Sequence, residues 1–337
     1  MSLPSTMTAV RRYDPYDDTV YGDKLPIVID GNTYATFRQV TEAIRTYIEE
    51  EQRKAYIKQT LLFIGTPLRM KQVDAIRLTN SLKENILLIA SQQHMMLASS
   101  IIYSIAASMH LQPGDHNDVC ELWGMTFDPY IVQARKSLPD NLRIVAGIAQ
   151  IRDRLCEIYD DLQDGVHTCK MITVCNLDMI QRELSNSTSE DSYDDAMEEV
   201  WPQLQPHEGA ATSTNKALTP SFDTMLKAVL KDGPVNGFHC MLVFSSVTAY
   251  TQCRLSDLFQ HKILFRTSAQ EAINLMPAAQ AIHYAKLASN QYRYFNGLDC
   301  NTYRPYFHRA LEWDNLTMDI SGDIHPIHQA DEDDYLF

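Results

Sequence analysis

The chain contains several apolar runs of strand length, and helical segments separate them. Residues 171–177 (MITVCNL) and 239–246 (HCMLVFSS) are almost wholly apolar, as are strands of a parallel sheet that is buried on both faces. Within residues 150–163, apolar side chains recur every three or four positions from Ile151 to Leu162, which is the period of one helix face. A repeated strand–helix order predicts an α/β fold, with a mostly parallel sheet and helices on both faces.

The remaining elements follow from the same patterns and from turn residues. Further strands are predicted at residues 60–68, 85–90, 119–127, 142–147 and 262–268, a hairpin at 25–37, one arm of a hairpin at 292–297, and helices at 41–58, 95–109 and 221–233.

Composition shifts divide the chain into parts. Residues 1–24 lack periodicity and predict an extended arm, and residues 25–59 predict a small α+β cap or linker. The sheet domain is expected at 60–310, interrupted by a polar stretch at 185–220 that we interpret as an insertion or mobile loop with a short helix. Residues 311–337 form an acidic tail.

Composition narrows the class of protein. Among 337 residues, 45% are hydrophobic and 21% charged, which is typical of a packed globular chain. The net charge of −14 argues against nucleic-acid binding by this chain alone. We find no apolar run near the roughly 20 residues of a membrane span and no signal-peptide pattern, so a cytoplasmic location is expected.

The cysteines and histidines do not predict a metal site. The seven cysteines are scattered and include no CxxC pair, so neither zinc nor a disulfide framework is indicated. His325 and His328 stand near carboxylates, which are ligand types, but a surface tail accounts for them as well.

One stretch is more specific than these patterns. In LKDGPVNGFHCMLVFSS, a helix ends at a turn that contains Gly233, Pro234, Gly237 and His239 and leads into a buried strand. This stretch, together with Asn296–Gly297 and Arg304–Tyr306, resembles a RecA-type ATPase domain of the FtsK/SpoIIIE (HerA-related) translocase family, which includes the type VII secretion proteins of EccC type. The similarity covers residues 60–307 and is clearest over the last hundred.

The resemblance implies that a phosphate-binding loop should follow the strand at 85–90. Where the family has G-x-x-x-x-G-K-[ST], this chain has Ala90, Ser91, Gln92, Gln93, His94, Met95, Met96 and Leu97. Both glycines, the lysine and the magnesium-binding hydroxyl are absent, so the residues that wrap the phosphates, neutralise them and ligate the metal have no counterparts.

Two further nucleotide elements depart from the family. The strand that should end in Asp-Glu ends in Cys175 and Asn176, so no acid stands where magnesium is held and water activated. The sensor position is occupied by Phe244 and Ser245. The resemblance therefore implies a pseudo-ATPase that needs neither ATP nor magnesium.

Three readings of function follow. The first is a catalytically inactive ATPase-fold module that serves as a structural, oligomerising or partner-binding part of a DNA-translocation or secretion machine. The second is an ATP-dependent DNA translocase subunit whose site is completed in trans, with Arg266 or Arg293 acting across an interface. The third is an α/β interaction protein of a phage or defence system. The expected partners are other subunits of such a machine, or further copies of the chain.

The end of the tail is a candidate docking segment. Four acids at 331–334 precede three apolar or aromatic residues. The residues of this candidate segment are Asp333, Asp334, Tyr335, Leu336 and Phe337. The alternative is a solvated tail that only aids solubility.

Overall fold

The computed structural model describes residues 27–29, 31–54, 59–69, 73–112, 120–125, 142–184, 220–255 and 257–307. The centre of this part is a nine-stranded sheet. In sheet order its strands are β4 (Gly65–Pro67), β13 (Cys300–Pro305), β12 (Tyr292–Phe295), β11 (His261–Phe265), β6 (Ile86–Ile89), β10 (Phe238–Phe244), β9 (Lys170–Cys175), β7 (Cys120–Gly124) and β8 (Leu142–Ala146).

Most of the sheet is parallel. The six strands from β11 to β8 all run in one direction, whereas β12, β13 and β4 form an antiparallel edge. The first parallel strand, β6, lies between the later strands β10 and β11. The predicted fold class, a mostly parallel sheet of RecA type with helices on both faces, is confirmed.

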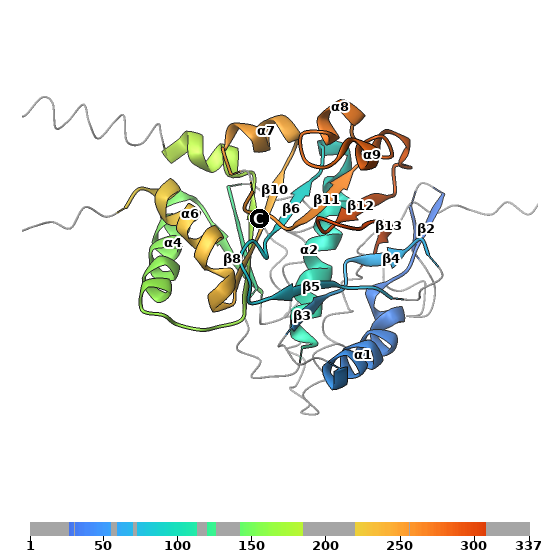
Figure 1. Cartoon of the computed structure of the whole chain (residues 1–337), viewed down its shortest axis with the longest axis horizontal. Helices are drawn as coiled ribbons and strands as arrows, with labels where there is room; N and C mark the ends of the chain where they lie inside the picture. The colour runs from blue at the N-terminus through green and yellow to red at the C-terminus, as the bar shows by residue number, and fades with distance from the viewer. Residues whose placement is uncertain are drawn as a thin grey trace, which may run out of the picture.

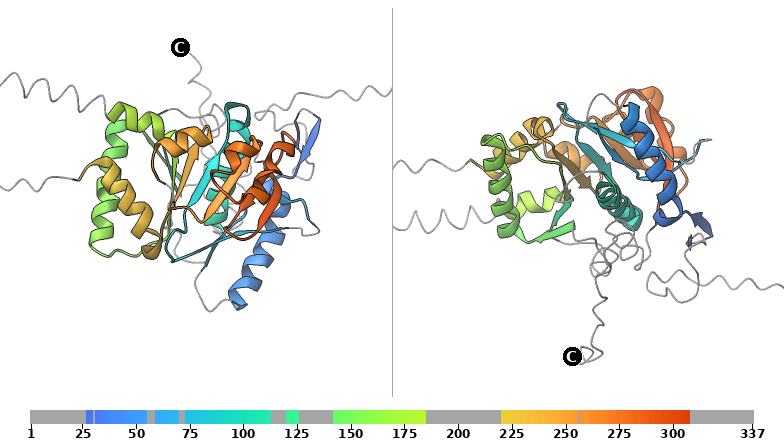
Figure 2. Two further views of the ribbon diagram at one scale, coloured as in Figure 1. Left: turned by 45° about the horizontal axis from the view of Figure 1, so that its top comes forward. Right: turned by 90° about the horizontal axis from the view of Figure 1, so that it is seen from below.

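Alternate residues of the central strands pack into two separate hydrophobic cores, one on each face of the sheet. On β6, Ile86 and Leu88 belong to one hydrophobic cluster, and Leu87 and Ile89 belong to the other. Two helices, α1 (Phe37–Lys54) and α2 (Met95–His110), cover the first face. The second face is covered by α4 (Ile148–Gln163), α6 (Phe222–Asp232), α7 (Val247–Gln252), α8 (Ala269–Ala272) and α9 (Ala278–Ala281). The right-hand view of Figure 2 shows α1 and α2 on one side of the sheet and α4 and α6 on the other.

Helix α2 is buried all round, because a second layer lies over it (Figure 1). This layer is a two-stranded antiparallel sheet of β3 (Gln59–Leu62) and β5 (Ile76–Thr79). Two side chains bond the backbone of this segment. The amide of Gln112, just beyond α2, bonds the N–H and C=O of Leu61 in β3, and Ser108 Oγ of α2 accepts from the N–H of Phe63 at 2.8 Å.

The prediction of a single strand at 60–68 is wrong. The segment forms β3 and β4, which belong to different sheets. The chain changes sheet between them, where the backbone of Phe63 is bonded to Ser108 of α2 and is no longer in a ladder.

The N-terminal cap consists of a hairpin and α1. The hairpin pairs β1 (Ile27–Ile29) with β2 (Asn32–Tyr34), as predicted. Helix α1 begins four residues before the predicted start, because Thr36 and Gln39 form a capping box in which each side chain accepts from the other's backbone N–H. The backbone of Phe307 bonds that of Ala35 and Phe37, which ties the cap to the end of the sheet domain.

Several predictions lie outside the described residues. They are the arm at 1–24, nearly all of the insertion at 185–220 and the tail at 311–337. Within the described ranges, none of the helices combines the length and the apolar character that a membrane crossing needs.

Candidate functional site

The loop after β6, which the sequence resemblance aligns with a phosphate-binding loop, lies at the carboxyl edge of the parallel strands. Ile89, the last residue of β6, is level with Phe244 on β10 and Leu264 on β11. The N–H of Ala90 donates to the carbonyl of Phe244 at 2.9 Å, which holds the start of the loop against β10. Connections leave β6 and β10 in opposite directions along the sheet, and ligands of open α/β sheets bind at such a switch point.

The side chain at the centre of this loop points inward. Residues Gln92–His94 form a single 3-10 turn, η1, and His94 is only 2% exposed. The His94 ring stacks on the Phe265 ring of β11, with centroids 5.0 Å apart and an interplanar angle of 17°. Its Nδ1 lies 2.9 Å from Ser91 Oγ. Burial, together with the charge of Arg266, lowers the pKa of His94, which favours the neutral imidazole.

Apolar side chains fill the positions of the lysine and the hydroxyl. Met95 and Met96 are half-buried, and Leu97 is 6% exposed within the core beneath α2. The carbonyls of Met95 and Met96 accept from the hydroxyls of Ser99 and Ser100 in the next turn. Only Gln92 and Gln93 are exposed, so the loop presents amide groups and no cation.

The end of β9 carries no acid. Cys175 is level with Val243 on β10 and is 4% exposed. Burial raises the pKa of its thiol to about 12, so the group is neutral at physiological pH. Asn176 adopts a left-handed backbone conformation (φ 55°), and its carbonyl accepts from Met179 and Ile180 in the first turn of the helix over residues 177–184.

The nearest carboxylate is already paired. Asp178 lies two residues beyond the predicted position and forms an ion pair with Arg182 on the same helix at 3.3 Å. At the sensor position, Phe244 is buried and Ser245 is exposed; the following Ser246 caps α7 by accepting from the N–H of Ala249 at 3.1 Å.

The two candidate arginines differ. Arg266 is exposed and follows Phe265 at the carboxyl edge. Arg293 is directed inward: its guanidinium donates to the carbonyls of Gln280 and Cys300 and lies over the Tyr284 ring at 5.3 Å. Arg266 is therefore the one of the pair whose side chain is accessible.

The motif that carries the family resemblance has a backbone role. Gly237 is left-handed (φ 86°), and a Cβ atom there would lie 1.6 Å from the carbonyl oxygen of Thr168. Gly233 ends α6, Pro234 opens the turn that follows, and His239 Nδ1 lies 2.8 Å from the carbonyl oxygen of Glu84. These residues lie at the amino edge of the strands, opposite the loop.

A buried network at this amino edge was not predicted. His261 Nε2 lies 2.7 Å from the Glu84 carboxylate and Nδ1 lies 2.7 Å from the Tyr294 hydroxyl. The Asn85 side chain donates to the carbonyls of Leu230 and Leu258 and accepts from the N–H of Cys240. The hydrogen bonds of His261 and of Asn85 connect the first residues of the strands to neighbouring loops, so we assign both side chains a structural role.

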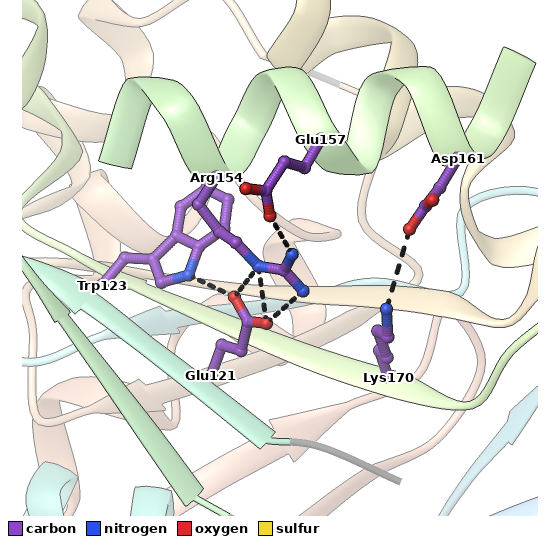
Figure 3. A network of polar contacts seen from close by, with 6 residues as sticks. All are labelled: Glu121, Trp123, Arg154, Glu157, Asp161 and Lys170. Carbon is purple, nitrogen blue, oxygen red and sulfur yellow. Dashed lines mark hydrogen bonds and ion pairs between the residues drawn. The ribbon is translucent and has the colours of Figure 1, made fainter. Parts of the chain in front are cut away.

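A second unpredicted network holds α4 on the sheet (Figure 3). The Glu121 carboxylate on β7 is 1% exposed and accepts from Arg154 at 2.6 and 2.8 Å and from Trp123 Nε1 at 2.9 Å. Arg154 also pairs with Glu157, and its hydrogen bonds with Glu121 raise its pKa. A glutamate inside the apolar run CELWG was the available signal, because an acid is rarely buried unless it is paired.

Neither a protein-family model nor a curated protein matches the sequence. Solved structures do resemble it. The cytoplasmic domain of EssC has 9% identity and a TM-score of 0.49, covering 84% of this chain and 48% of that chain. The cytoplasmic domain of the type VII secretion ATPase EccC from Thermomonospora curvata has 10% identity and a TM-score of 0.49, covering 80% and 32%. The pCW3 conjugation coupling protein TcpA has 8% identity and a TM-score of 0.47, covering 77% and 70%.

The chain thus spans less than half the length of the first two structures. The predicted resemblance to ATPase domains of type VII secretion proteins is confirmed as a likeness of fold. At these identities and TM-scores the likeness assigns neither an activity nor a partner.

Proposed function

We propose that this chain is an ATPase-fold module that does not hydrolyse ATP. The observation that carries the proposal is the inward-facing His94, which stacks on Phe265 at the centre of the loop. A working phosphate loop leaves its centre open, so that backbone N–H groups can surround the phosphates. Here an imidazole is packed at that centre, and no lysine or strand-end acid accompanies it.

Burial of the neighbouring positions also argues against completion in trans. A subunit across an interface could supply an arginine or an acid. It could not supply the magnesium-binding hydroxyl, because that position is Leu97, which is 6% exposed within this chain's own core. The module therefore works without a nucleotide cycle, and its surfaces carry its specificity.

The role in a machine rests on the sequence resemblance. Multi-domain members of the resembled family combine a hydrolysing domain with degenerate copies, and the loop of this chain is degenerate in the same sense. We propose that the module is a structural, oligomerising or partner-binding part of a secretion or DNA-transport machine.

Binding of ATP with magnesium tests the proposal. A ligand present at 100 times its dissociation constant adds roughly 2.7 kcal/mol to the free energy of unfolding, which thermal denaturation detects readily. We expect no shift of the melting midpoint up to millimolar ATP and no heat in calorimetry. A saturable shift that requires magnesium would refute the proposal and favour a motor with a non-standard loop.

A further inference from the structure

The connection between β11 and β12 presents an apolar surface. Helices α8 and α9 contact one another within it (Figure 1, top). Ile273 follows α8 and is 43% exposed, and Ile282 follows α9 and is 53% exposed. Pro277, Ala278 and Ala279 between them are exposed as well. We call this surface, residues 266–291, the α8–α9 surface.

The charge of this region is opposite to that of the whole chain. Residues 266–291 include two basic residues, Arg266 and Lys286, against a single acid, Glu271, whereas the net charge of the chain is −14. The Glu271 carboxylate is engaged by the hydroxyls of Thr267 and Ser268 in a capping box. Arg266 and Lys286 are exposed, so the α8–α9 surface presents two basic side chains together with the apolar Ile273 and Ile282.

The C-terminal tail has the complementary chemistry. Residues 311–337 include eight Asp and Glu and no Lys or Arg. Four of these acids, at 331–334, immediately precede Tyr335, Leu336 and Phe337. An acidic segment followed by an apolar one is complementary to a surface that presents both basic and apolar side chains.

The chain leaves the fold at the edge where this surface lies. Strand β12 is antiparallel to β11, and its first residue, Tyr292, is level with Phe265. Strand β13 is antiparallel to β12, and Tyr303 near its end is level with Tyr292. Phe307 therefore lies at the carboxyl edge, as do Phe265 and the start of the α8–α9 connection. The 24 residues from Phe307 to position 331 can span up to about 80 Å at about 3.3 Å each, which is ample for this reach.

We propose that residues 331–337 dock on the α8–α9 surface of their own chain. The acids contact Arg266 and Lys286, and Tyr335, Leu336 and Phe337 cover Ile273 and Ile282. A flexible connection gives the tail an effective concentration in the millimolar range, so a weak contact suffices. Occupied by its own tail, the surface is closed to other proteins, and a partner that binds there must displace the tail. This inference does not depend on whether the chain hydrolyses ATP.

Photo-crosslinking of the full chain tests the docking. A benzophenone amino acid is placed at position 337, and the crosslinked peptides are identified by mass spectrometry. We expect crosslinks within one chain to residues 266–291. Raising the salt from 0.1 M to 1 M shortens the screening length from about 10 Å to about 3 Å and should reduce the yield severalfold.

Surface variants make the test specific. Ile282→Asp should lower the yield by about tenfold, because the apolar end of the tail would then bury an unpaired carboxylate. Arg266→Glu should act in the same direction through repulsion of the acids. Leu82→Asp, at a 60% exposed apolar position before β6, is the matched control and should leave the yield unchanged. Crosslinks scattered over other surfaces, crosslinks between two chains, or equal effects of Ile282→Asp and Leu82→Asp would each overturn the proposal.

Discussion

Replacing His94 with alanine tests whether the loop after β6 is a packed structure. The ring is 2% exposed, stacks on Phe265 and is hydrogen-bonded to Ser91. An aromatic stack contributes about 0.5–1.5 kcal/mol beyond its area, and a hydrogen bond contributes about 0.5–1.5 kcal/mol. His94→Ala should therefore lower the free energy of unfolding by about 1–3 kcal/mol. Urea denaturation measures this as a lower midpoint at an unchanged slope.

Two control variants sharpen the measurement. Gln93→Ala changes an exposed neighbour in the same turn and should stay within about 0.5 kcal/mol of the parent. His94→Phe keeps an aromatic ring against Phe265 but loses the hydrogen bond, so it should fall between the parent and His94→Ala. If His94→Ala costs no more than Gln93→Ala, the ring does not fill the loop, and the main support for an inactive site is lost.

The pH dependence of stability gives an independent check. The pKa of His94 is lowered in the folded state by burial and by Arg266, so below pH 6.5 the unfolded state binds the proton more readily. Stability should therefore fall as the pH decreases through this range. His94→Phe removes this contribution and should flatten the curve, while His239, whose pKa burial also lowers, keeps its own. An unchanged curve in His94→Phe would contradict the burial of a neutral imidazole.

Three further outcomes are expected. Arg154→Met should cost about 3–5 kcal/mol in denaturant unfolding because it leaves the buried Glu121 carboxylate without its cation, and adding Glu121→Met should recover most of that loss; equal stability of both variants would refute the assignment. Asn85→Ala should cost at least about 2 kcal/mol, since it leaves three buried backbone groups without partners, and a loss below about 1 kcal/mol would contradict the geometry. Met96→Lys should show no phosphate release from ATP above the parent, and measurable magnesium-dependent hydrolysis would disprove the account of the loop.

The fold was largely predictable because the buried strands leave a strong signal. The bounds of the runs at 171–177 and 239–246 lie within two residues of those of β9 and β10, and the period from Ile151 to Leu162 identifies α4. Strand β4 was not separated from β3, because the apolar Phe63 and Ile64 leave no break in the pattern, and β5 (IRLT) and β13 (CNTYRP), which are partly polar, were not predicted. The start of α1 was missed for a different reason: its capping box uses a threonine and a glutamine that periodicity does not detect.

The candidate site was predictable only as a set of absences. The sequence shows that Met96 and Leu97 stand where a lysine and a hydroxyl are expected. It does not show that His94 turns inward, because that depends on Phe265, which is 171 positions away along the chain. Nor does it show that Arg293 is occupied internally. The position of His94 depends on a contact between distant parts of the chain, and that of Arg293 depends on how the connection from β11 to β12 folds back on it; residue patterns alone show neither.

The two edges of the parallel strands are under different physical constraints. At the amino edge, Gly237 cannot accept a Cβ atom without a clash with Thr168, so that turn depends on glycine for the fold itself. At the carboxyl edge, the loop needs glycines and a lysine only in order to hold phosphates. If the loop holds no phosphate, as proposed, its positions are free to carry bulky apolar residues such as Leu97 of α2, which lies in the core and stabilises the fold. Restoring lysine at Met96 alone would leave the inward His94 and the buried Leu97 in place, so a nucleotide site would require the unpacking of a core that now includes them.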